Sequence, residues 1–164
     1  MGAAAREEYK KAWRHIAGLA DEVCKPNMIP TLILTSWTAN PKSGADRTLQ
    51  AYDPGKDVVD VIAWDPYNGA GNNEYYDYKS PEIIFGDVVR ASQADGRPWG
   101  IAETGVEVEP QGGPAGRVKW LTESGNYLKA RNPLFVSYFN SDKPDGNWEL
   151  DDVPAQQAWG AFVR

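Results

Sequence analysis

The sequence is poor in the residues on which several classes of site depend. It has 164 residues, of which one is cysteine and one is histidine. A single cysteine excludes an internal disulfide and a cysteine-based zinc site. A Ser-His-Asp or Cys-His mechanism would have to use His15, which lies within a predicted helix where a structural role is expected. We therefore expect no metal site and no nucleophile that is activated by histidine.

Signals for secretion, membrane insertion and polyanion binding are also missing. Residues 1–5 carry no cationic segment followed by an apolar run, so we do not expect a signal peptide there. No apolar run approaches the length of about 18 residues that would indicate a membrane span. The chain has 17 basic and 23 acidic residues, a net charge of −6, and no basic cluster. This balance argues against nucleic acid as a partner, because Lys and Arg are what bind phosphates.

Motifs for cofactors and ions are not found either. The glycines of Gly69-Ala70-Gly71 lack the spacing of a dinucleotide fingerprint, and there is no P-loop. The segment 142–149 is rich in Asp and Asn, but its spacing does not match a helix-loop-helix calcium loop. We therefore expect no cofactor, and a solvated loop over 142–149.

Aromatic residues, in contrast, are abundant. The chain holds seven Trp and eight Tyr, and 41% of its residues are hydrophobic, which is enough for a packed core. The aromatic residues could belong to that core. They could equally line a carbohydrate cleft, where flat rings pack on the apolar faces of sugars. Composition alone leaves both readings open.

Apolar periodicity predicts helices and strands that alternate along the chain. Predicted helices cover 6–23, 80–94, 117–131 and 154–163, and predicted strands cover 31–37, 58–64, 98–102 and 134–139. The first strand is mostly apolar and is expected to be buried on both faces. Alternation of this kind predicts one α/β domain over residues 1–164, with parallel strands joined by helical crossovers.

Side chains that suit sugar chemistry stand at the ends of the four predicted strands. In such a fold the loops that follow the strands build the site. The residues that these ends offer are Trp37, Asp65, Tyr67, Glu103, Tyr138 and Asn140. A sugar-cleaving cleft needs carboxylates for the chemistry and aromatic platforms for binding. These six residues are therefore candidates for such a cleft, Glu103 for the chemistry and the other five for binding substrate, while an ion pair, a hydrogen bond or core packing stays the alternative for each.

Three stretches resemble family 26 glycoside hydrolases. Residues 52–60 followed by Trp64-Asp65-Pro66-Tyr67-Asn68 look like the sixth-strand region of these β-mannanase-like enzymes. Residues 98–105, which end in Glu103-Thr104-Gly105, are similar to their seventh strand, which ends in the nucleophilic Glu. The opening helix resembles the helix after their fourth strand through Tyr9, Trp13 and Arg14.

The resemblance covers nearly the whole chain and implies the C-terminal half, about strands 5–8, of a TIM (β/α)8 barrel. It implies a retaining, endo-β-1,4-mannanase- or glucanase-like hydrolase of polysaccharide, with Glu103 as the nucleophile. Secretion is usual for such enzymes. Two features depart from the pattern. The family's acid/base Glu would lie just upstream of residue 1, and Tyr138-Phe139 stand where a Trp is expected.

Half of a barrel would be an incomplete structure. A whole barrel takes about 250 residues, and half of one leaves unpaired strand edges. We therefore expect the chain to pair with a missing N-terminal half or with a second copy, or to be a truncated gene product. Without the acid/base, hydrolysis should be slower by about 10²–10⁴-fold. The alternatives are a non-catalytic carbohydrate-binding or scaffold protein derived from such a barrel, and a half-barrel without a sugar function.

Overall fold

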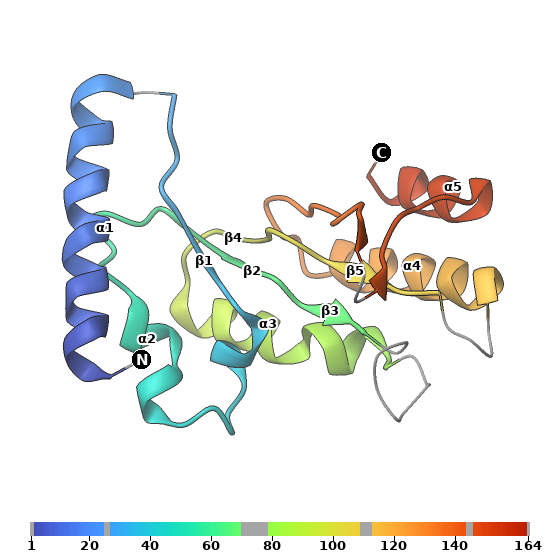
Figure 1. The fold of residues 1–164 in the computed structure, drawn as a ribbon, viewed down its shortest axis with the longest axis horizontal. Helices are drawn as coiled ribbons and strands as arrows, with labels where there is room; N and C mark the ends of the chain where they lie inside the picture. The colour runs from blue at the N-terminus through green and yellow to red at the C-terminus, as the bar shows by residue number, and fades with distance from the viewer. Residues whose placement is uncertain (1, 25–26, 70–78, 109–112, 144–145, 164) are drawn as a thin grey trace. The chain divides into compact units, whose positions relative to one another are not determined.

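Helices and strands alternate along the chain in the order that the sequence predicts (Figure 1). The computed structural model describes residues 2–24, 27–69, 79–108, 113–143 and 146–163. The helices are α1 (Ala3–Cys24), α2 (Leu49–Tyr52), α3 (Pro81–Asp95), α4 (Gly113–Lys129) and α5 (Val153–Phe162), with short 3-10 turns η1 (Ser36–Ala39) and η2 (Ala45–Arg47). The strands are β1 (Thr31–Leu34), β2 (Val61–Trp64), β3 (Tyr67–Asn68), β4 (Trp99–Ile101), β5 (Gly105–Val106), β6 (Asp142–Lys143) and β7 (Gly146–Asn147).

Parallel strands dominate the hydrogen bonding of the sheets. The first sheet has the order β1-β2-β4, and β1 pairs with β2 from Thr31 opposite Val61 to Leu34 opposite Trp64. The chain then pairs again beyond β2 and β4, where β3 and β5 form a parallel pair. An α/β fold with parallel strands and helical crossovers is therefore confirmed. The three-stranded sheet and the two-stranded β3–β5 pair are too few to show half of an eight-stranded barrel. The half-barrel therefore stays a prediction.

Residues divide into two units. The first unit holds residues 1–64 and 87–100, and the second holds 65–86 and 101–164. In the first unit, the buried Trp64 indole donates a hydrogen bond of 2.8 Å to Ser92 Oγ. The Arg97 guanidinium bonds to Asp53 and Asp95, and this joins the turn after α2 to the turn after α3.

The strand β1 is not buried on both faces, as the sequence predicted. Leu32 and Leu34 are buried, but Ile33 between them is 53% exposed. The apolar run could not reveal this difference, because β1 is the outermost strand in its sheet and only one of its faces is covered. Apolar side chains on the second face therefore remain in water, which a protein surface tolerates when they are isolated.

The predicted strand 134–139 is also less regular than expected. It makes one isolated parallel bridge, between Val136 and Ile101. Main-chain bonds join Ile101 to Phe135 and Ser137, and then Thr104 to Ser137 and Phe139, at 2.8–3.1 Å. Between these two sets of bonds the first strand advances three residues, from Ile101 to Thr104, while the second advances two, from Ser137 to Phe139. The extra residue is a bulge at positions 102–103, and bulges re-aim side chains.

In the second unit, α4 and α5 pack closely at a glycine. The helix α4 begins at Gly113, four residues before the predicted start, and buries Trp120, Leu121 and Leu128. A Cβ atom at Gly125 would lie 3.0 Å from the Phe162 ring of α5. The sequence indicated only that Gly125 weakens its helix. The structure gives the compensating reason, which is close approach of the second helix.

Candidate functional site

Glu103 lies in the bulge that follows β4, with an exposed side chain. Its Oε2 atom accepts a hydrogen bond of 2.6 Å from the Tyr67 phenol. Tyr67 begins β3, and the β3–β5 pairing places it opposite Gly105. The register of two very short strands therefore brings together a carboxylate and a phenol that are 36 residues apart.

The electrostatics of this pair keep the phenol a hydrogen-bond donor. Partial burial raises the pKa of Tyr67 well above its ordinary value, and the hydrogen bond to Glu103 and the charge of Glu103 raise it further. The charge of Asp65 adds to the same effect. A tyrosine with a raised pKa stays protonated at neutral pH, so its O–H continues to orient the carboxylate.

Two aromatic rings pack against the Tyr67 ring of this pair. The Tyr67 ring makes edge contacts with Trp148, at 5.0 Å between ring centroids and 73°, and with Phe139, at 5.9 Å and 78°. We call Tyr67, Phe139 and Trp148 the aromatic cluster. Edge-to-face pairs of this kind stabilise by about 0.5–1.5 kcal/mol beyond the burial of their area. The two contacts therefore fix the ring of the tyrosine that donates to the Glu103 carboxylate.

The backbone behind Glu103 is held firmly. Thr104 is buried, and its hydroxyl donates to the Pro66 carbonyl at 2.7 Å, which joins the ends of two strands. At Gly105, a Cβ atom would lie 2.9 Å from Trp148 and 3.2 Å from Tyr67. Glycine is thus required here for the rings to approach the strand. Each residue of the Glu103-Thr104-Gly105 strand end therefore has its own contact: Glu103 accepts from Tyr67, Thr104 donates to Pro66, and Gly105 leaves room for the rings.

We expect Gly105→Ala to disturb the aromatic cluster. The added methyl group would overlap Trp148, so the ring must move, and overpacking of this kind costs about 1–3 kcal/mol of unfolding free energy. Near-ultraviolet circular dichroism should lose part of its aromatic signal, and the urea midpoint should fall. The matched control is Gly160→Ala in α5, where a Cβ atom would meet nothing within 4 Å and should leave both measurements nearly unchanged or slightly improved. An unchanged aromatic spectrum in Gly105→Ala would contradict the contact.

The segment that carries Trp148 is held from two sides. The Leu150 N–H donates to Asn140 Oδ1 at 2.7 Å, which fastens the segment to the end of the 134–139 strand. The Arg117 guanidinium of α4 donates to the Glu149 carbonyl at 2.7 Å. Asn140 was expected to bind substrate. In the structure its amide oxygen orders the segment that follows Trp148, and substrate contact by Asn140 stays a prediction.

Arg117 is the buried centre of a polar network whose carboxylates reach the surface. Besides the Glu149 carbonyl, it bonds to Asp151 at 2.6 Å and to Asp152 at 2.7 Å, while its own side chain is 1% exposed. Asp152 also caps α5, because its Oδ1 accepts the Ala155 N–H at 2.7 Å. One guanidinium thus joins α4, the segment after Trp148 and the start of α5. Sequence reasoning did not find Arg117, because an arginine at the start of a predicted helix carries no signal of burial.

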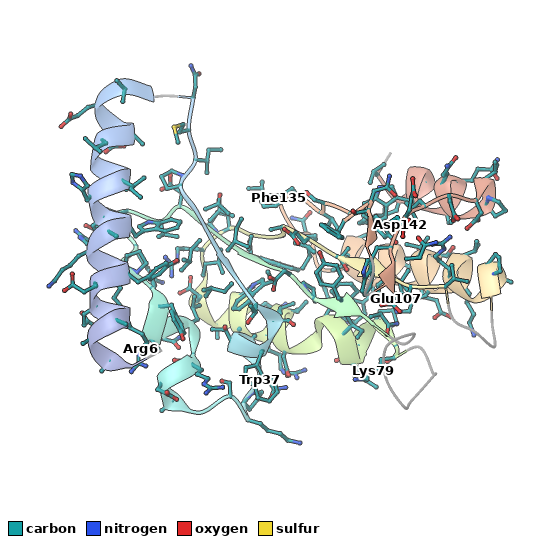
Figure 2. All side chains as sticks on the ribbon, in the orientation of Figure 1. Arg6, Trp37, Lys79, Glu107, Phe135 and Asp142 are labelled. Carbon is teal, nitrogen blue, oxygen red and sulfur yellow. The ribbon has the colours of Figure 1, made fainter. Side chains whose placement is uncertain are left out.

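The other predicted site residues lie in different surroundings. The Tyr138 ring packs on Trp159 of α5 at 5.2 Å between centroids, its hydroxyl lies 3.3 Å from the Val106 carbonyl, and burial raises its pKa. Trp37 lies on η1 in the first unit and is half-exposed (Figure 2). The structure therefore brings Glu103 and Tyr67 together, with Asp65 within electrostatic range. Substrate contacts by Tyr138 and Trp37 stay predictions.

Two further findings concern metals and membranes. In the part of the chain that the structure describes, no group of three or more His, Cys, Asp or Glu side chains is arranged to hold a metal ion. Within the same residues, none of the helices combines the length and the apolar character that a membrane span requires.

Comparison with known proteins identifies a fold and no family. No family model matches the chain, and no curated protein matches it. A crystal structure of an engineered protein aligns with 98% of this chain and 36% of its own, at 17% identity and a TM-score of 0.62. The endo-β-1,4-mannanase of Thermotoga petrophila aligns with 97% of this chain and 39% of its own, at 12% identity and a TM-score of 0.60.

A third structure agrees. The hyperthermostable endo-1,4-β-D-mannanase of Thermotoga petrophila RKU-1 aligns with 97% of this chain and 51% of its own, at 13% identity and a TM-score of 0.54. The chain therefore spans between about a third and a half of the proteins that it matches. At these identities the likeness concerns the fold alone: the chain has an α/β fold similar to that of part of each of these structures.

Proposed function

We propose that the chain is part of the catalytic domain of a retaining glycoside hydrolase. The fold would be the C-terminal half, about strands 5–8, of a family 26-like barrel, and the substrate a β-1,4-linked mannan or glucan. One observation carries the proposal: the exposed Glu103 carboxylate accepts a 2.6 Å hydrogen bond from Tyr67 beside an aromatic cluster. The fold similarity to two endo-mannanases supports it.

The chemistry would be a double displacement. Tyr67 holds Oε2 of Glu103, which leaves Oε1 to attack the anomeric carbon of the sugar. The bond from that carbon to the leaving oxygen breaks, and a glycosyl ester forms on Glu103. Water then cleaves this ester and restores the carboxylate, so the configuration of the sugar is retained. The aromatic cluster would pack on the apolar face of the sugar ring.

A complete site needs a second carboxyl group. In retaining enzymes the acid/base stands about 5–5.5 Å from the nucleophile and protonates the leaving oxygen. The proposal assigns that group to a strand upstream of residue 1. The 164-residue chain should therefore hydrolyse natural glycans slowly. A leaving group that departs without a proton removes this requirement, and it allows Glu103 to be tested in the chain as it exists.

The test is covalent labelling by 2,4-dinitrophenyl 2-deoxy-2-fluoro-β-mannoside. Dinitrophenolate leaves without acid catalysis, and the fluorine slows hydrolysis of the ester, so an adduct should accumulate. Intact mass spectrometry should show one added fluoromannosyl group, and peptide mapping should place it on Glu103. The matched control Glu123→Gln, on the exposed side of α4, should be labelled like the parent chain. An adduct on another residue would contradict the proposal.

The second candidate is a non-catalytic carbohydrate-binding or scaffold protein. It is favoured by the same aromatic cluster, because edge-packed Tyr67 and Trp148 would hold a sugar ring without any chemistry. Electrophoresis through gels that contain mannan or glucan separates the candidates. Retardation without labelling would assign a binding protein, whereas neither retardation nor labelling would remove the sugar function altogether.

A further inference from the structure

The buried side chain of Asn68 bonds to both main-chain groups of Lys79, within the second unit. Its Nδ2 atom donates to the Lys79 carbonyl at 3.2 Å, and its Oδ1 atom accepts the Lys79 N–H at 3.4 Å. Successive side chains of a strand point to opposite faces, so Asn68 points away from the face on which Tyr67 meets Glu103. A pair of bonds to one residue is what a neighbouring strand supplies in an antiparallel ladder. Here a single side chain supplies it.

The Lys79 carbonyl also accepts a hydrogen bond from α4. The Trp120 indole donates to it at 3.0 Å, and a carbonyl oxygen can accept two such bonds. The Trp120 ring is buried and lies 5.9 Å, between centroids, from the Phe85 ring of α3. Lys79 itself stands two residues before α3 begins at Pro81 (Figure 2). Asn68 therefore attaches the end of β3 to a main-chain segment that α3 and α4 hold in place.

The strand β3 depends on such attachments because its own ladder is short. It pairs with β5 over two residues, and a pair of strands without further support is marginal in stability. The residue before Tyr67, Pro66, accepts a hydrogen bond at its carbonyl from the Thr104 hydroxyl. The residue after it, Asn68, bonds to Lys79. Tyr67 thus lies between two residues that are tied to different parts of the fold.

We propose that Asn68 is a positioning residue, which holds the Tyr67 phenol where it donates to Glu103. The hydrogen bond from Tyr67 to Glu103 Oε2 is 2.6 Å long, and hydrogen bonds weaken steeply as their geometry departs from the ideal. A small shift of β3 would therefore break it. Asn68 lies on the other face of the strand and acts on the carboxylate through Tyr67. This positioning is independent of the chemistry of Glu103, whereas its effect on a rate rests on the proposed function.

The test uses Asn68→Leu, which keeps a side chain branched at Cγ and removes both hydrogen bonds, while the Lys79 carbonyl retains the Trp120 indole. The readout is the ¹³C resonance of Tyr67 Cζ in the chain labelled at its tyrosines, identified by its loss in Tyr67→Phe. At neutral pH, Glu103→Gln should move this resonance, because the acceptor of the phenol loses its charge. In the Asn68→Leu background, most of that shift should be lost.

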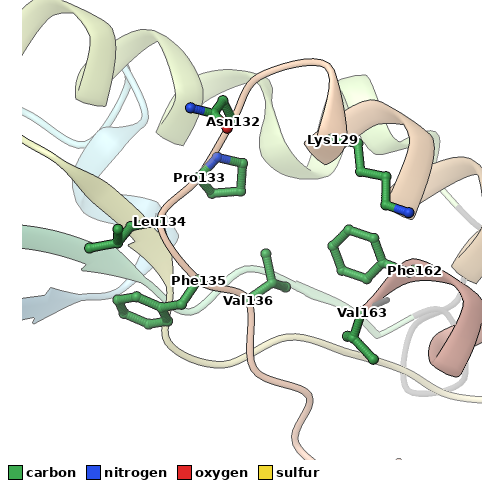
Figure 3. Close-up of a pocket in the computed structure, with 8 residues that line it drawn as sticks. All are labelled: Lys129, Asn132, Pro133, Leu134, Phe135, Val136, Phe162 and Val163. Atoms are coloured by element: carbon green, nitrogen blue, oxygen red, sulfur yellow. The ribbon is translucent and has the colours of Figure 1, made fainter.

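Two controls separate this effect from changes elsewhere in the second unit. Asn126→Leu makes the same substitution at an exposed position of α4. Val163→Ala shortens an exposed side chain just after α5, at the pocket where the ends of α4 and α5 meet (Figure 3). In both backgrounds, Glu103→Gln should move the Tyr67 resonance as it does in the parent chain. Asn68→Ala removes the same two bonds without adding bulk, and it covers the case in which leucine prevents folding.

Turnover of 2,4-dinitrophenyl β-mannoside provides the second readout. Asn68→Leu should slow the reaction by about 10–100-fold, as the loss of the Tyr67 hydrogen bond would. The double variant with Tyr67→Phe should be no slower than Tyr67→Phe alone, because both changes remove the same interaction. Losses that multiply in the double variant would overturn the proposal, since a general loosening of the fold acts beside Tyr67 and not through it.

The two readouts distinguish the possible failures. Far-ultraviolet circular dichroism identifies the folded variants. A folded Asn68→Leu or Asn68→Ala chain in which Tyr67 still responds fully to Glu103→Gln would overturn the positioning role. The same holds if Glu103→Gln leaves the Tyr67 resonance of the parent chain in place. Absence of turnover in the parent chain would instead count against the proposed function, and the resonance would still decide the role of Asn68.

Discussion

Glu103→Gln is expected to lower the turnover of 2,4-dinitrophenyl β-mannoside by more than about 10³-fold, because an amide oxygen is a poor nucleophile toward the anomeric carbon. The leaving group needs no proton, so the measurement reports the attack itself. Gln has the shape of Glu, and the Tyr67 phenol can still donate to its oxygen, so binding of mannan should persist. Release of dinitrophenolate, followed by its absorbance, provides the rate.

Two variants sharpen this result. Tyr67→Phe removes one hydrogen bond to a charged acceptor, a loss of about 1.5–3 kcal/mol, and should slow the reaction by about 10–100-fold. Glu123→Gln, an exposed carboxylate of α4, should not change the rate. If the parent chain turns over the substrate and Glu103→Gln does so at the same rate, Glu103 is not the nucleophile. A loss of mannan binding together with turnover would assign Glu103 a binding role.

Arg117→Met is expected to reduce the free energy of unfolding by about 3 kcal/mol. The buried guanidinium bonds to Asp151, to Asp152 and to the Glu149 carbonyl. Methionine fills part of the volume but satisfies none of these acceptors, so each of them loses its donor. Urea unfolding followed by far-ultraviolet circular dichroism measures the change.

The matched control lies one half-turn along the same helix. Lys119→Met removes a cation that is 77% exposed and 3.9 Å from Glu123, and surface pairs of this kind contribute about 0–1 kcal/mol. Its urea midpoint should stay close to that of the parent chain. If Arg117→Met and Lys119→Met lowered the urea midpoint by the same small amount, the Arg117 network would not be a major source of stability.

The same network predicts a dependence on pH. The hydrogen bond from Arg117 holds the pKa of Asp151 below its ordinary value. A carboxyl group with a lowered folded pKa stabilises the fold above its unfolded pKa, about 3.9 for Asp. This contribution is lost as the pH falls through the lower, folded pKa. The urea midpoints of the parent chain and of Arg117→Met should therefore approach each other below pH of about 4.

The network also connects stability to the site. Arg117 fastens the Glu149 carbonyl, and the residue before it, Trp148, packs on Tyr67. Tyr67 in turn bonds to Glu103. Loss of the Arg117 hydrogen bond should therefore let the segment after Trp148 move, and the rings of the aromatic cluster should then adopt a wider range of positions. In Arg117→Met we expect the aromatic circular dichroism to weaken at urea concentrations where the helices are still intact.

The order of the main helices and strands could be predicted from the sequence, because most of them show a local apolar pattern, although that pattern did not reveal the exposed face of β1. The helix α3 begins at Pro81 after a turn residue, as such starts do, and β4 ends just before Glu103, as expected. The position of a carboxylate at a strand end follows from the same pattern. These features depend on neighbours within a few residues, which a sequence displays directly.

Register and loop contacts could not be predicted in this way. The bulge at 102–103 depends on how residues 101–104 pair with residues 135–139, and no local period encodes that offset. Trp148 stands in a segment without periodicity, so nothing in its surroundings indicated contact with Tyr67. The contact between the rings of Tyr138 and Trp159 was not predicted either, and substrate contact by Tyr138 stays a prediction. Each case depends on residues that are distant along the chain.

The sequence by itself determined the alternation of parallel strands and helices, and it placed Glu103 after a strand with Thr104 and Gly105 behind it. Only the tertiary structure decided which side chains meet there: the Tyr67 phenol through the β3–β5 register, and Trp148 through the absence of a Cβ at Gly105. The physical reason is the distance along the sequence over which each kind of interaction acts. Burial patterns repeat every few residues, whereas hydrogen bonds and ring contacts between distant segments exist only once the chain has folded.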